Sequence, residues 1–502
     1  MPLQTKRWAQ NPAIYEINTW VWLSDLSAKY GDFVELGSVP SSEWDALAEF
    51  GFDAIWLMGV WERSPLGIGI ANHNPALLED FGRALPDFHP LDNVGSPYCV
   101  RKYEVDELLG GPTGLAIARE ELASRGMRLI LDFVPNHVAP DHPWVAQSPE
   151  YFISGDAADL EANPAAFQTL GGKILACGRD PQAPAWHYGL QLNAFHPGLR
   201  QATRDTLLRI AGQCDGLCCD LAILAVNSVF ERTWGGRAGQ PPSAEYWPDA
   251  ISAVKAANPE FLFMAEAYRD LERELQQQGF DFCYDTKLYD GLEGNTPGSI
   301  RFQLGADPGD QFRLVRFIEN HGESRAAAIF SPARERGAAV VAATLPGARL
   351  FHEGQFEGRR VKLPVFLGRR PVEPIDRELS EFYRKLLEAI RSPVFHEGEW
   401  RLCEPAAAGN PSDQEVVAWT WVNGDDRRLV VVNLSDRPAE TRIQLPWGDG
   451  EAWSFLDTFS DTVCVRQREE SPDGSLCVTL GPWHYHLFQC QKIGETIRAL
   501  AA

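Results

Sequence analysis

The sequence predicts an α/β fold: a (β/α)8 barrel of TIM type, with a small insert after its third strand and a C-terminal antiparallel β-sandwich. Three observations lead to this prediction. Short apolar runs alternate with helix-like segments over residues 13–391, and one stretch in the first half lacks this rhythm. After residue 391, the chain changes to closely spaced strand-like runs separated by turn residues.

Eight apolar runs are candidates for the barrel strands. Their hydrophobicity is continuous rather than alternating, which indicates strands that are buried on both faces. Segments between them, such as PTGLAIAREELASRG and LRQATRDTLLRIAGQ, have the apolar spacing of helices. Eight strand–helix units are typical of a (β/α)8 barrel. In chain order the runs are Ala13–Trp20, Ala54–Met58, Leu129–Val134, Gly216–Leu224, Phe261–Ala265, Phe280–Tyr284, Leu314–Ile318 and Ala348–Phe351.

Breaks in this pattern give the expected domain bounds. The barrel is predicted to comprise residues 1–137 and 200–391. Residues 138–199 contain Pro, Gly and Trp but few long periodic runs, so they are predicted to form the small insert. From residue 392, runs such as EVVAWTWVN and RRLVVVNLS are separated by Asn-Gly-Asp and Pro-Asp-Gly turns. This pattern of short strand-like runs and turns predicts a β-sandwich over residues 392–502.

The charge balance narrows the range of partners. With 46 Lys+Arg against 69 Asp+Glu, the formal net charge is −23, so a nucleic-acid partner is not expected. The N-terminal residues show no secretion signal and no apolar run reaches membrane-spanning length, so we expect a cytoplasmic chain without a membrane partner. Ten cysteines without CxxC spacing fit a reducing compartment. No particular oligomeric state is indicated.

Polar residues end four of the predicted strands, at the edge where such a barrel carries its chemistry. Each alone has a structural explanation, such as a helix cap or an ion pair. On neighbouring strands, however, Asp220 and Glu266 predict a facing carboxylate pair. Retaining glycosidases use two such groups, which lie roughly 5–5.5 Å apart. The strand-end residues are Asp132, Asn136 and His137, then Asp220, then Glu266, and finally Glu319, Asn320 and His321.

These stretches resemble the α-amylase family, glycoside hydrolase family 13. LILDFVPNH, DGLCCDLAIL, FLFMAEAY and VRFIENHGESR are similar to the four signature regions of that family, in order and approximate spacing. SPYCVRKYEVD is similar to the segment that carries its substrate-stacking tyrosine. The resemblance implies that Asp220 is the nucleophile and Glu266 the acid/base. The residues that it implies for substrate binding are Tyr98, His137, Asn320 and His321.

Two positions depart from the family pattern. The family has an arginine two residues before the nucleophile, where this sequence has Cys218, and an aspartate after the second histidine, where it has Gly322. Loss of the guanidinium predicts a raised pKa and weaker attack for the nucleophile. A lost transition-state contact costs on the order of 10²–10³ in rate. Asp132, the neighbour of the arginine in the family, then needs another donor, for which Lys102 and Arg269 are candidates.

Three functional hypotheses stay open. The favoured one is a retaining glycosidase or transglycosylase that acts on α-glucosides or α-glucans with an altered active site. The second is a catalytically impaired carbohydrate-binding or regulatory protein on the same scaffold. The third is another reaction on a sugar-like molecule, with a Cys218 thiol that faces the cleft.

We expect a carbohydrate as the partner and no cofactor. Asn136 matches a position that binds structural calcium in many amylases. Residues 138–199 nevertheless offer no clear run of partner oxygens, and calcium needs about six to eight of them. The sequence therefore predicts no metal site.

Overall fold

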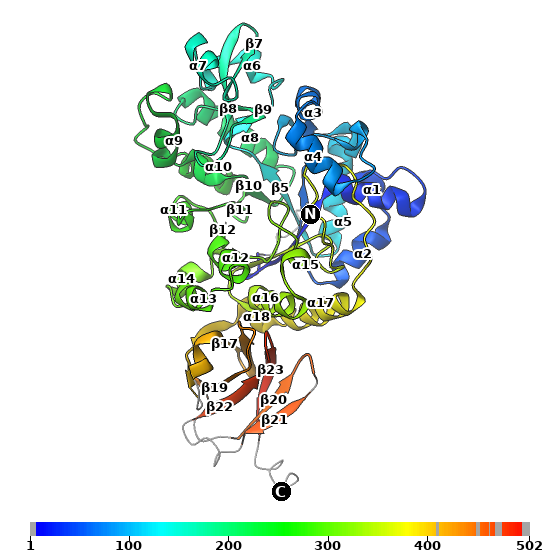
Figure 1. Cartoon of the computed structure of the whole chain (residues 1–502), viewed down its shortest axis with the longest axis vertical. Helices are drawn as coiled ribbons and strands as arrows, with labels where there is room; N and C mark the ends of the chain where they lie inside the picture. Colours follow the sequence, from blue (N-terminus) through cyan, green and yellow to red (C-terminus); the bar gives the residue numbers. More distant parts are fainter. Residues whose placement is uncertain (1–6, 408–410, 448–451, 461, 467–473, 494–502) are drawn as a thin grey trace. The chain divides into compact units, whose positions relative to one another are not determined.

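The computed structural model describes residues 7–407, 411–447, 452–460, 462–466 and 474–493. Eight parallel strands form a closed barrel in the order β1-β14-β13-β12-β11-β10-β5-β2 (Figure 1). Each predicted apolar run supplies one of them, so the predicted barrel is confirmed. The strands are β1 (Ala13–Asn18), β2 (Ala54–Met58), β5 (Arg128–Phe133), β10 (Gly216–Cys219), β11 (Leu262–Ala265), β12 (Phe282–Tyr284), β13 (Leu314–Arg316) and β14 (Ala348–His352).

Burial explains why the strand runs are continuously apolar. Every residue of β1, β2, β10, β11 and β12 is buried, as expected for parallel strands that are covered on both faces. Four predicted runs are too long at their carboxyl ends, those of β1, β5, β10 and β13. Strand β1 ends at Asn18, whose side chain caps helix α1 (Thr19–Tyr30), and β10 ends at Cys219 because Leu221 turns the chain.

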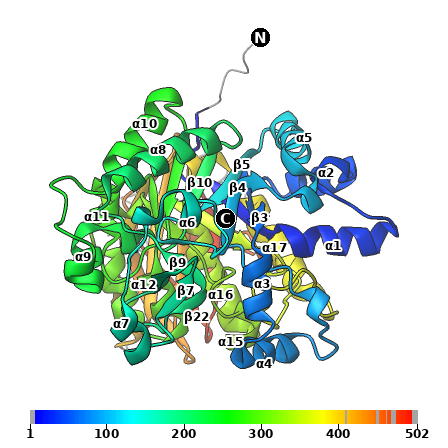
Figure 2. The same cartoon turned by 90° about the horizontal axis from the view of Figure 1, so that it is seen from above.

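Helices alternate with the strands, and several begin at a capping side chain. Asp376, for example, accepts a hydrogen bond from Leu379 N at the start of α17 (Arg377–Ile390). Helices α8 (Pro197–Ala211) and α10 (Trp247–Ala257) lie side by side in both views (Figure 1, Figure 2). No helix in the described ranges combines the length and apolarity needed to cross a membrane. The remaining helices of residues 41–397 that flank the barrel strands are α2 (Ser41–Glu49), α3 (Pro65–Ala71), α4 (Pro75–Ala84), α5 (Gly111–Ser124), α9 (Asn227–Trp234), α11 (Glu272–Gln277), α12 (Thr286–Glu293), α13 (Pro297–Leu304), α14 (Pro308–Gln311), α15 (Ala326–Ile329), α16 (Pro332–Thr344) and α18 (Pro393–Glu397).

The chain between β5 and α8 forms the insert that was expected after the third barrel strand. Its antiparallel sheet has the order β6-β9-β8-β7, and a small apolar cluster that includes Phe152, Leu175 and Leu190 holds it together. The exact domain bounds stay a prediction. The elements of the insert are β6 (His137–Val138), α6 (Trp144–Gln147), α7 (Ala157–Ala162), β7 (Phe167–Leu170), β8 (Lys173–Gly178) and β9 (Trp186–Gln191); a separate ribbon pairs β3 (Trp61–Arg63) with β4 (Val100–Val105).

The C-terminal region forms two antiparallel sheets, as predicted. Their orders are β15-β17-β18-β23-β20-β21 and β16-β19-β22. Side chains of both sheets, among them Val431, Ile443 and Leu476, meet in one apolar core. The strands are β15 (Glu399–Cys403), β16 (Pro405–Ala407), β17 (Val416–Asn423), β18 (Asp426–Asn433), β19 (Ala439–Gln444), β20 (Trp453–Asp457), β21 (Val463–Arg466), β22 (Ser475–Leu480) and β23 (Tyr485–Lys492).

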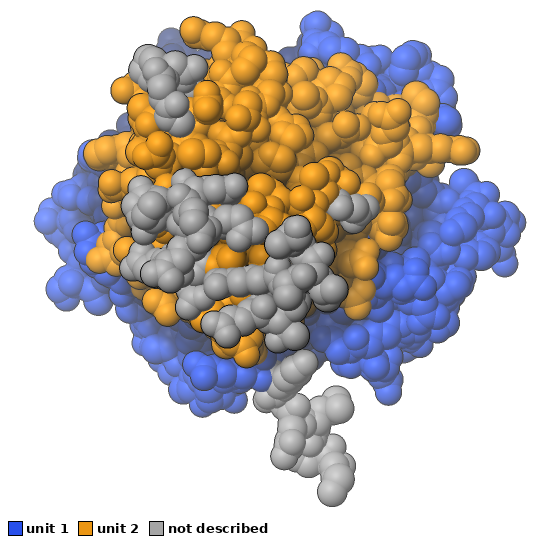
Figure 3. Space-filling model, turned by 90° about the horizontal axis from the view of Figure 1, so that it is seen from below, with its two compact units in different colours: residues 1–8, 14–284, 361–372 blue, residues 9–13, 285–360, 373–502 orange. Residues whose placement is uncertain are grey.

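The chain divides into two compact units (Figure 3). Unit 1 consists of residues 1–8, 14–284 and 361–372, and it contains the insert. Unit 2 consists of residues 9–13, 285–360 and 373–502, and it contains the C-terminal sheets.

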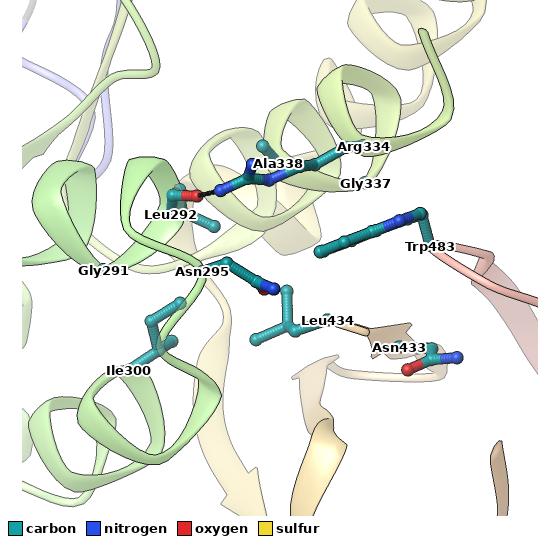
Figure 4. A pocket seen from close by; sticks show the side chains of 10 residues that line it. All are labelled: Gly291, Leu292, Asn295, Ile300, Arg334, Gly337, Ala338, Asn433, Leu434 and Trp483. Atoms are coloured by element: carbon teal, nitrogen blue, oxygen red, sulfur yellow. Dashed lines mark hydrogen bonds between the residues drawn. The ribbon is translucent and has the colours of Figure 1, made fainter. Parts of the chain in front are cut away.

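Within unit 2, the side chain of Arg334 on α16 reaches the end of α12 and lies near Trp483 (Figure 4). Its guanidinium donates to the main-chain oxygens of Leu292 and Glu293. The same group lies 5.0 Å from the ring centroid of Phe330 and 5.2 Å from that of Trp483. The adjoining pocket holds about 10 Å³, the space of about one water molecule, so these contacts serve packing.

A buried ion pair between Arg316 and Asp285 stabilises unit 2. Asp285 caps α12 by accepting from Leu288 N at 3.1 Å, and its carboxylate also accepts from the Arg316 guanidinium. Arg316 donates further to Pro346 O at 3.0 Å and to the Gln311 side chain at 2.6 Å. Both charges have lost their water, so each depends on the other.

We therefore expect Asp285→Ala to lower the free energy of unfolding by about 3–5 kcal/mol, because it leaves the Arg316 charge buried without its partner. Urea unfolding followed by circular dichroism measures the loss. Asp249→Ala is the matched control, since it breaks an exposed pair with Arg204 at 3.6 Å and should cost at most about 1 kcal/mol. Equal losses in the two variants would contradict the buried-pair account.

Candidate active site

Main-chain hydrogen bonds between the ends of β10 and β11 bring Asp220 and Glu266 to adjacent positions. Glu266 N donates to Cys219 O at 3.0 Å, and Ala222 N donates to Glu266 O at 3.1 Å. A third bond reaches the side chain, since Leu221 N donates to Glu266 Oε2 at 2.9 Å. The structure thus brings together the two acids that the sequence singles out.

The turn at Leu221 is strained. Its φ of 39° and ψ of 48° are left-handed, a conformation that costs an ordinary L residue about 1–2 kcal/mol. The turn follows directly on Asp220, whose N–H donates to Phe133 O at 2.8 Å. Because the turn aims the Leu221 N–H at the Glu266 carboxyl group, the strain is offset by a hydrogen bond. Strain of this kind is concentrated at functional sites.

Both oxygens of the Glu266 carboxylate have donors. Leu221 N binds Oε2, and the Tyr268 hydroxyl donates to Oε1 at 2.9 Å. Asp220 is 8% exposed, whereas Glu266 is half-buried. The Glu266 carboxyl group is therefore held in one orientation and stays accessible to a ligand, as an acid/base must.

Tyr98 lies among these acids. Burial raises the pKa of its hydroxyl well above the ordinary value, and the charges of Asp132, Asp220 and Glu266 raise it further. Tyr98 is half-buried on the segment before β4. It therefore presents a neutral ring and hydroxyl beside three carboxylates.

His137 is held in a narrow slot of the insert. Its ring lies 5.0 Å from that of Trp186, and the residue is 2% exposed. A Cβ at Gly178 would lie 2.9 Å from the His137 Cβ, and one at Gly189 would overlap the imidazole ring. Burial lowers the pKa of His137 to about 4, against a small opposing effect of the Tyr98 carbonyl. His137 is consequently neutral at physiological pH. Both of its ring nitrogens are buried, and substrate binding by His137 stays a prediction.

Cys218 is a buried, un-ionised thiol. It lies in register with Asp132 of β5 and with Met264 of β11, so the three side chains point to the same side of the sheet. Its sulfur lies 3.7 Å from the Tyr284 hydroxyl oxygen, and the residue is 4% exposed. Burial, with the charge of Glu266, raises the pKa of the thiol well above its ordinary value. These properties disfavour the hypothesis of a reactive thiol.

Asp132 obtains its hydrogen bonds from β2 and the turn that follows it. Trp56 Nε1 donates to the carboxylate at 2.8 Å, and Gly59 N donates at 2.5 Å. The Gly59 carbonyl in turn accepts from the Arg63 guanidinium at 3.0 Å. The main chain of one residue, Gly59, therefore links the Asp132 carboxylate to a buried cation. Burial lowers the pKa of Arg63 to about 10, while the charges of Asp106 and Asp132 act in the opposite direction.

The prediction that Lys102 or Arg269 donates to Asp132 is wrong. Lys102 pairs with two glutamates of the β3–β4 ribbon, and Arg269 pairs with Asp180 of the insert. The directions in which the Lys102 and Arg269 side chains point depend on the folded structure. Arg269, for example, occupies a left-handed turn with φ 65°. Sequence reasoning missed Arg63, which directly follows another charged residue, Glu62, in the segment VWERSP and carries no distinctive signal.

In unit 2, a buried ion pair closes the loop that follows β13. Glu319 Oε1 lies 2.8 Å from Arg325 Nη1, and Glu319 Oε2 accepts from Ala326 N at 2.7 Å. His352 Nδ1 lies 3.2 Å from Glu319 Oε1. Burial raises the pKa of Glu319, although the charge of Arg325 opposes this shift. The contacts of Glu319 with Arg325 and Ala326 thus hold the two ends of the loop together.

Asn320, His321 and Gly322 lie in this loop. The Asn320 Oδ1 atom accepts from Gly322 N at 2.8 Å and from Glu323 N at 3.0 Å. Its amide nitrogen is buried and has no hydrogen-bond partner in the described part of the chain. The oxygen therefore shapes the turn, and only the nitrogen is available for the predicted binding role. His321 is half-buried. Substrate binding by Asn320 and His321 stays a prediction.

The side chain of Asn136 is engaged within the protein. Gln191 Nε2 donates to Asn136 Oδ1 at 2.8 Å and to its main-chain oxygen at 3.0 Å. An amide donor thus occupies the oxygens that a cation would need. Among the described residues, no cluster of three or more His, Cys, Asp and Glu side chains could hold a metal ion.

The buried His137 predicts a specific loss of stability in acid. Its folded pKa of about 4 lies below the ordinary value of about 6.5, so the fold favours the neutral ring. Stability from this group is complete above about pH 6.5 and is lost as the pH falls toward 4, by about 3 kcal/mol. His137→Gln should remove this part of the acid sensitivity in urea titrations at several pH values. The exposed control His73→Gln should keep it, and an identical pH profile for wild type and His137→Gln would refute the assignment.

Comparisons with known proteins agree with this architecture. No family model matches the sequence. The chain is 24% identical over 493 residues to the α-amylase MalA of Haloarcula japonica, which covers 95% of this chain and 62% of the relative. It therefore spans about three fifths of the length of that curated relative.

Solved structures share the fold at low sequence identity. A noncanonic maltogenic α-amylase, AmyB from Thermotoga neapolitana, is 18% identical with a TM-score of 0.68, covering 96% of this chain and 99% of that one. An α-amylase from Geobacillus thermoleovorans, solved in complex with acarbose, is 18% identical with a TM-score of 0.67, covering 97% and 100%. The chain is therefore similar in sequence to a protein named as an α-amylase, and it shares the fold of the α-amylases whose structures are solved.

Proposed function

We propose that the chain is a retaining enzyme on α-glucosides or α-glucans, a hydrolase or transglycosylase, with Asp220 as nucleophile and Glu266 as acid/base. One observation carries this proposal: the hydrogen bonds between β10 and β11 hold the two carboxylates at adjacent strand ends. The relatives named as α-amylases, one of them bound to acarbose, support α-glucans as the substrate class.

The proposed chemistry has two steps. In the first, the Asp220 carboxylate attacks the anomeric carbon while the glycosidic bond breaks and the Glu266 proton passes to the leaving oxygen. In the second, water or an acceptor hydroxyl gives its proton to Glu266 and attacks the same carbon, which releases Asp220. The Tyr268 hydroxyl and the Leu221 N–H keep the Glu266 carboxyl group oriented through both steps.

We further propose that the active site is altered by a relocated positive charge. Cys218 supplies no cation beside Asp132, although the two positions are in register. Instead Gly59 joins Asp132 to Arg63, since its N–H donates to the carboxylate and its carbonyl accepts from the guanidinium. Arg63 then serves as a positioning residue, because it acts through Gly59 and Asp132 and not on the sugar.

A carbohydrate-binding protein without turnover is the second candidate. The observation that favours it is the uncharged Cys218 at the position where the family has an arginine. In this case Tyr98 and His137, both neutral, would bind a glucan without any bond cleavage.

Substitution of the two acids tests catalysis. We expect Asp220→Asn to abolish turnover of maltoheptaose, and Glu266→Gln to reduce it by about 10²–10⁴-fold, because each removes a reacting group. Mass spectrometry of the products measures both effects, and urea unfolding shows whether the variants stay folded. The matched control is Asp205→Asn on the exposed face of α8. Normal turnover in Asp220→Asn would exclude the proposal, whereas binding without turnover in the wild type would favour the second candidate.

Thiol alkylation separates the proposed enzyme from a thiol-dependent reaction. In the native protein, iodoacetamide should label the exposed Cys464 and Cys477 but leave Cys218 unmodified, because Cys218 is buried and un-ionised. In urea all three should react. Peptide mass spectrometry measures the labelling. Rapid native labelling of Cys218 that maltoheptaose blocks would instead support a reactive thiol.

A further inference from the structure

Unit 1 contains a cavity that none of the predicted site residues lines. Its volume is about 470 Å³, within the range of about 300–1,000 Å³ that is usual for small-ligand sites. The walls come from β4, the start of α5, the insert and the end of α8. Its principal lining residues are Lys102, Tyr103, His142, Trp144, Arg209 and Gln213.

Two aromatic side chains of the cavity have fixed positions. The Trp144 ring lies 4.6 Å from the His142 ring and 5.6 Å from the Tyr151 ring, both edge-on, and Trp144 is half-buried. Trp144 N also donates to His142 Nδ1 at 3.1 Å. The Tyr103 hydroxyl donates to Val134 O at 3.1 Å and accepts from Val134 N at 3.0 Å. A ligand therefore meets the rings and not the Tyr103 hydroxyl.

Rigid rings of this kind suit the apolar faces of a sugar, because they add contact area at little cost in entropy. Both residues are held before any ligand arrives. An indole that is half-buried at a cavity wall also leaves apolar area that a ligand would cover.

The opposite wall supplies hydrogen-bonding groups. Arg209 spends one bond on the Thr206 hydroxyl at 3.1 Å and makes no ion pair among the described residues. Gln213 donates to Arg209 O at 3.4 Å, a long bond that leaves its amide oxygen available. Lys102 lies 3.6 Å from Glu104 and the same distance from Glu62, so its charge is balanced locally. A neutral ligand rich in hydroxyl groups fits this wall better than a polyanion.

We propose that this cavity is a second carbohydrate-binding site, which takes one or two sugar units of a neutral glucan. Trp144 and Tyr103 contact the sugar faces, and Arg209 and Gln213 bind hydroxyl groups. Binding here needs no turnover. Only its benefit for catalysis, a higher local concentration of long chains near the carboxylates, rests on the proposed function.

Calorimetry on the Asp220→Asn protein tests the second site without turnover. Titration with maltoheptaose should give two sites in this background and one after adding Trp144→Ala. Arg209→Ala is a second variant that should leave the structure of the insert intact, because the Arg209 side chain is exposed. This substitution should weaken maltoheptaose binding at the same site at least about five-fold. Maltoheptaose binding that both double variants leave unchanged, or no maltoheptaose binding at all, would overturn the proposal. Binding of inorganic phosphate that Arg209→Ala abolishes, without maltoheptaose binding, would overturn it too.

Kinetics separate this proposal from the proposed function. With catalytic residues intact, Trp144→Ala should raise KM for amylose several-fold and leave turnover of a chromogenic maltoside unchanged. Equal effects on both substrates would contradict a separate site. Absence of turnover in every form would count against the proposed function alone, since the calorimetric experiment does not depend on turnover.

Discussion

The hydrogen bonds that join the ends of β10 and β11 are the constraint on which the candidate site depends. They fix Glu266 against the chain that follows Asp220 and force Leu221 into a left-handed turn. Two carboxylates on neighbouring strand ends repel each other, and the fold offsets this with donors on both Glu266 oxygens. A closed barrel supplies this arrangement because its parallel strands all end at the same edge.

The surroundings of Asp132 show a second solution to the same problem. A buried carboxylate needs hydrogen-bond donors. Because position 218 is a cysteine and supplies no guanidinium, the Trp56 indole and the Gly59 N–H donate to Asp132 instead. Arg63 contributes its charge from further away, through the main chain of Gly59. Gly59 has φ +80°, and a Cβ there would come 2.5 Å from the Arg63 guanidinium, so the link requires glycine.

The sequence allowed prediction of all eight barrel strands, because strands buried on both faces leave continuous apolar runs. It also located Asp220 and Glu266 at adjacent strand ends. The donors of Asp132 could not be predicted, since they depend on how the turn after β2 folds back. The left-handed turn at Leu221 lies inside an apolar run that gives no sign of it. The internal role of the Asn320 oxygen was likewise hidden, because it depends on loop geometry.

Trapping of the covalent intermediate tests the central claim most directly. A 5-fluoro-α-glucosyl fluoride forms its glycosyl ester readily but releases it slowly, so a retaining enzyme accumulates the adduct. Digestion and peptide mass spectrometry then locate the modified residue. The account predicts one fluoroglucosyl group on Asp220 in the wild-type protein and none in Asp220→Asn. A stable adduct on another side chain, or no adduct while glucan binding is intact, would contradict it.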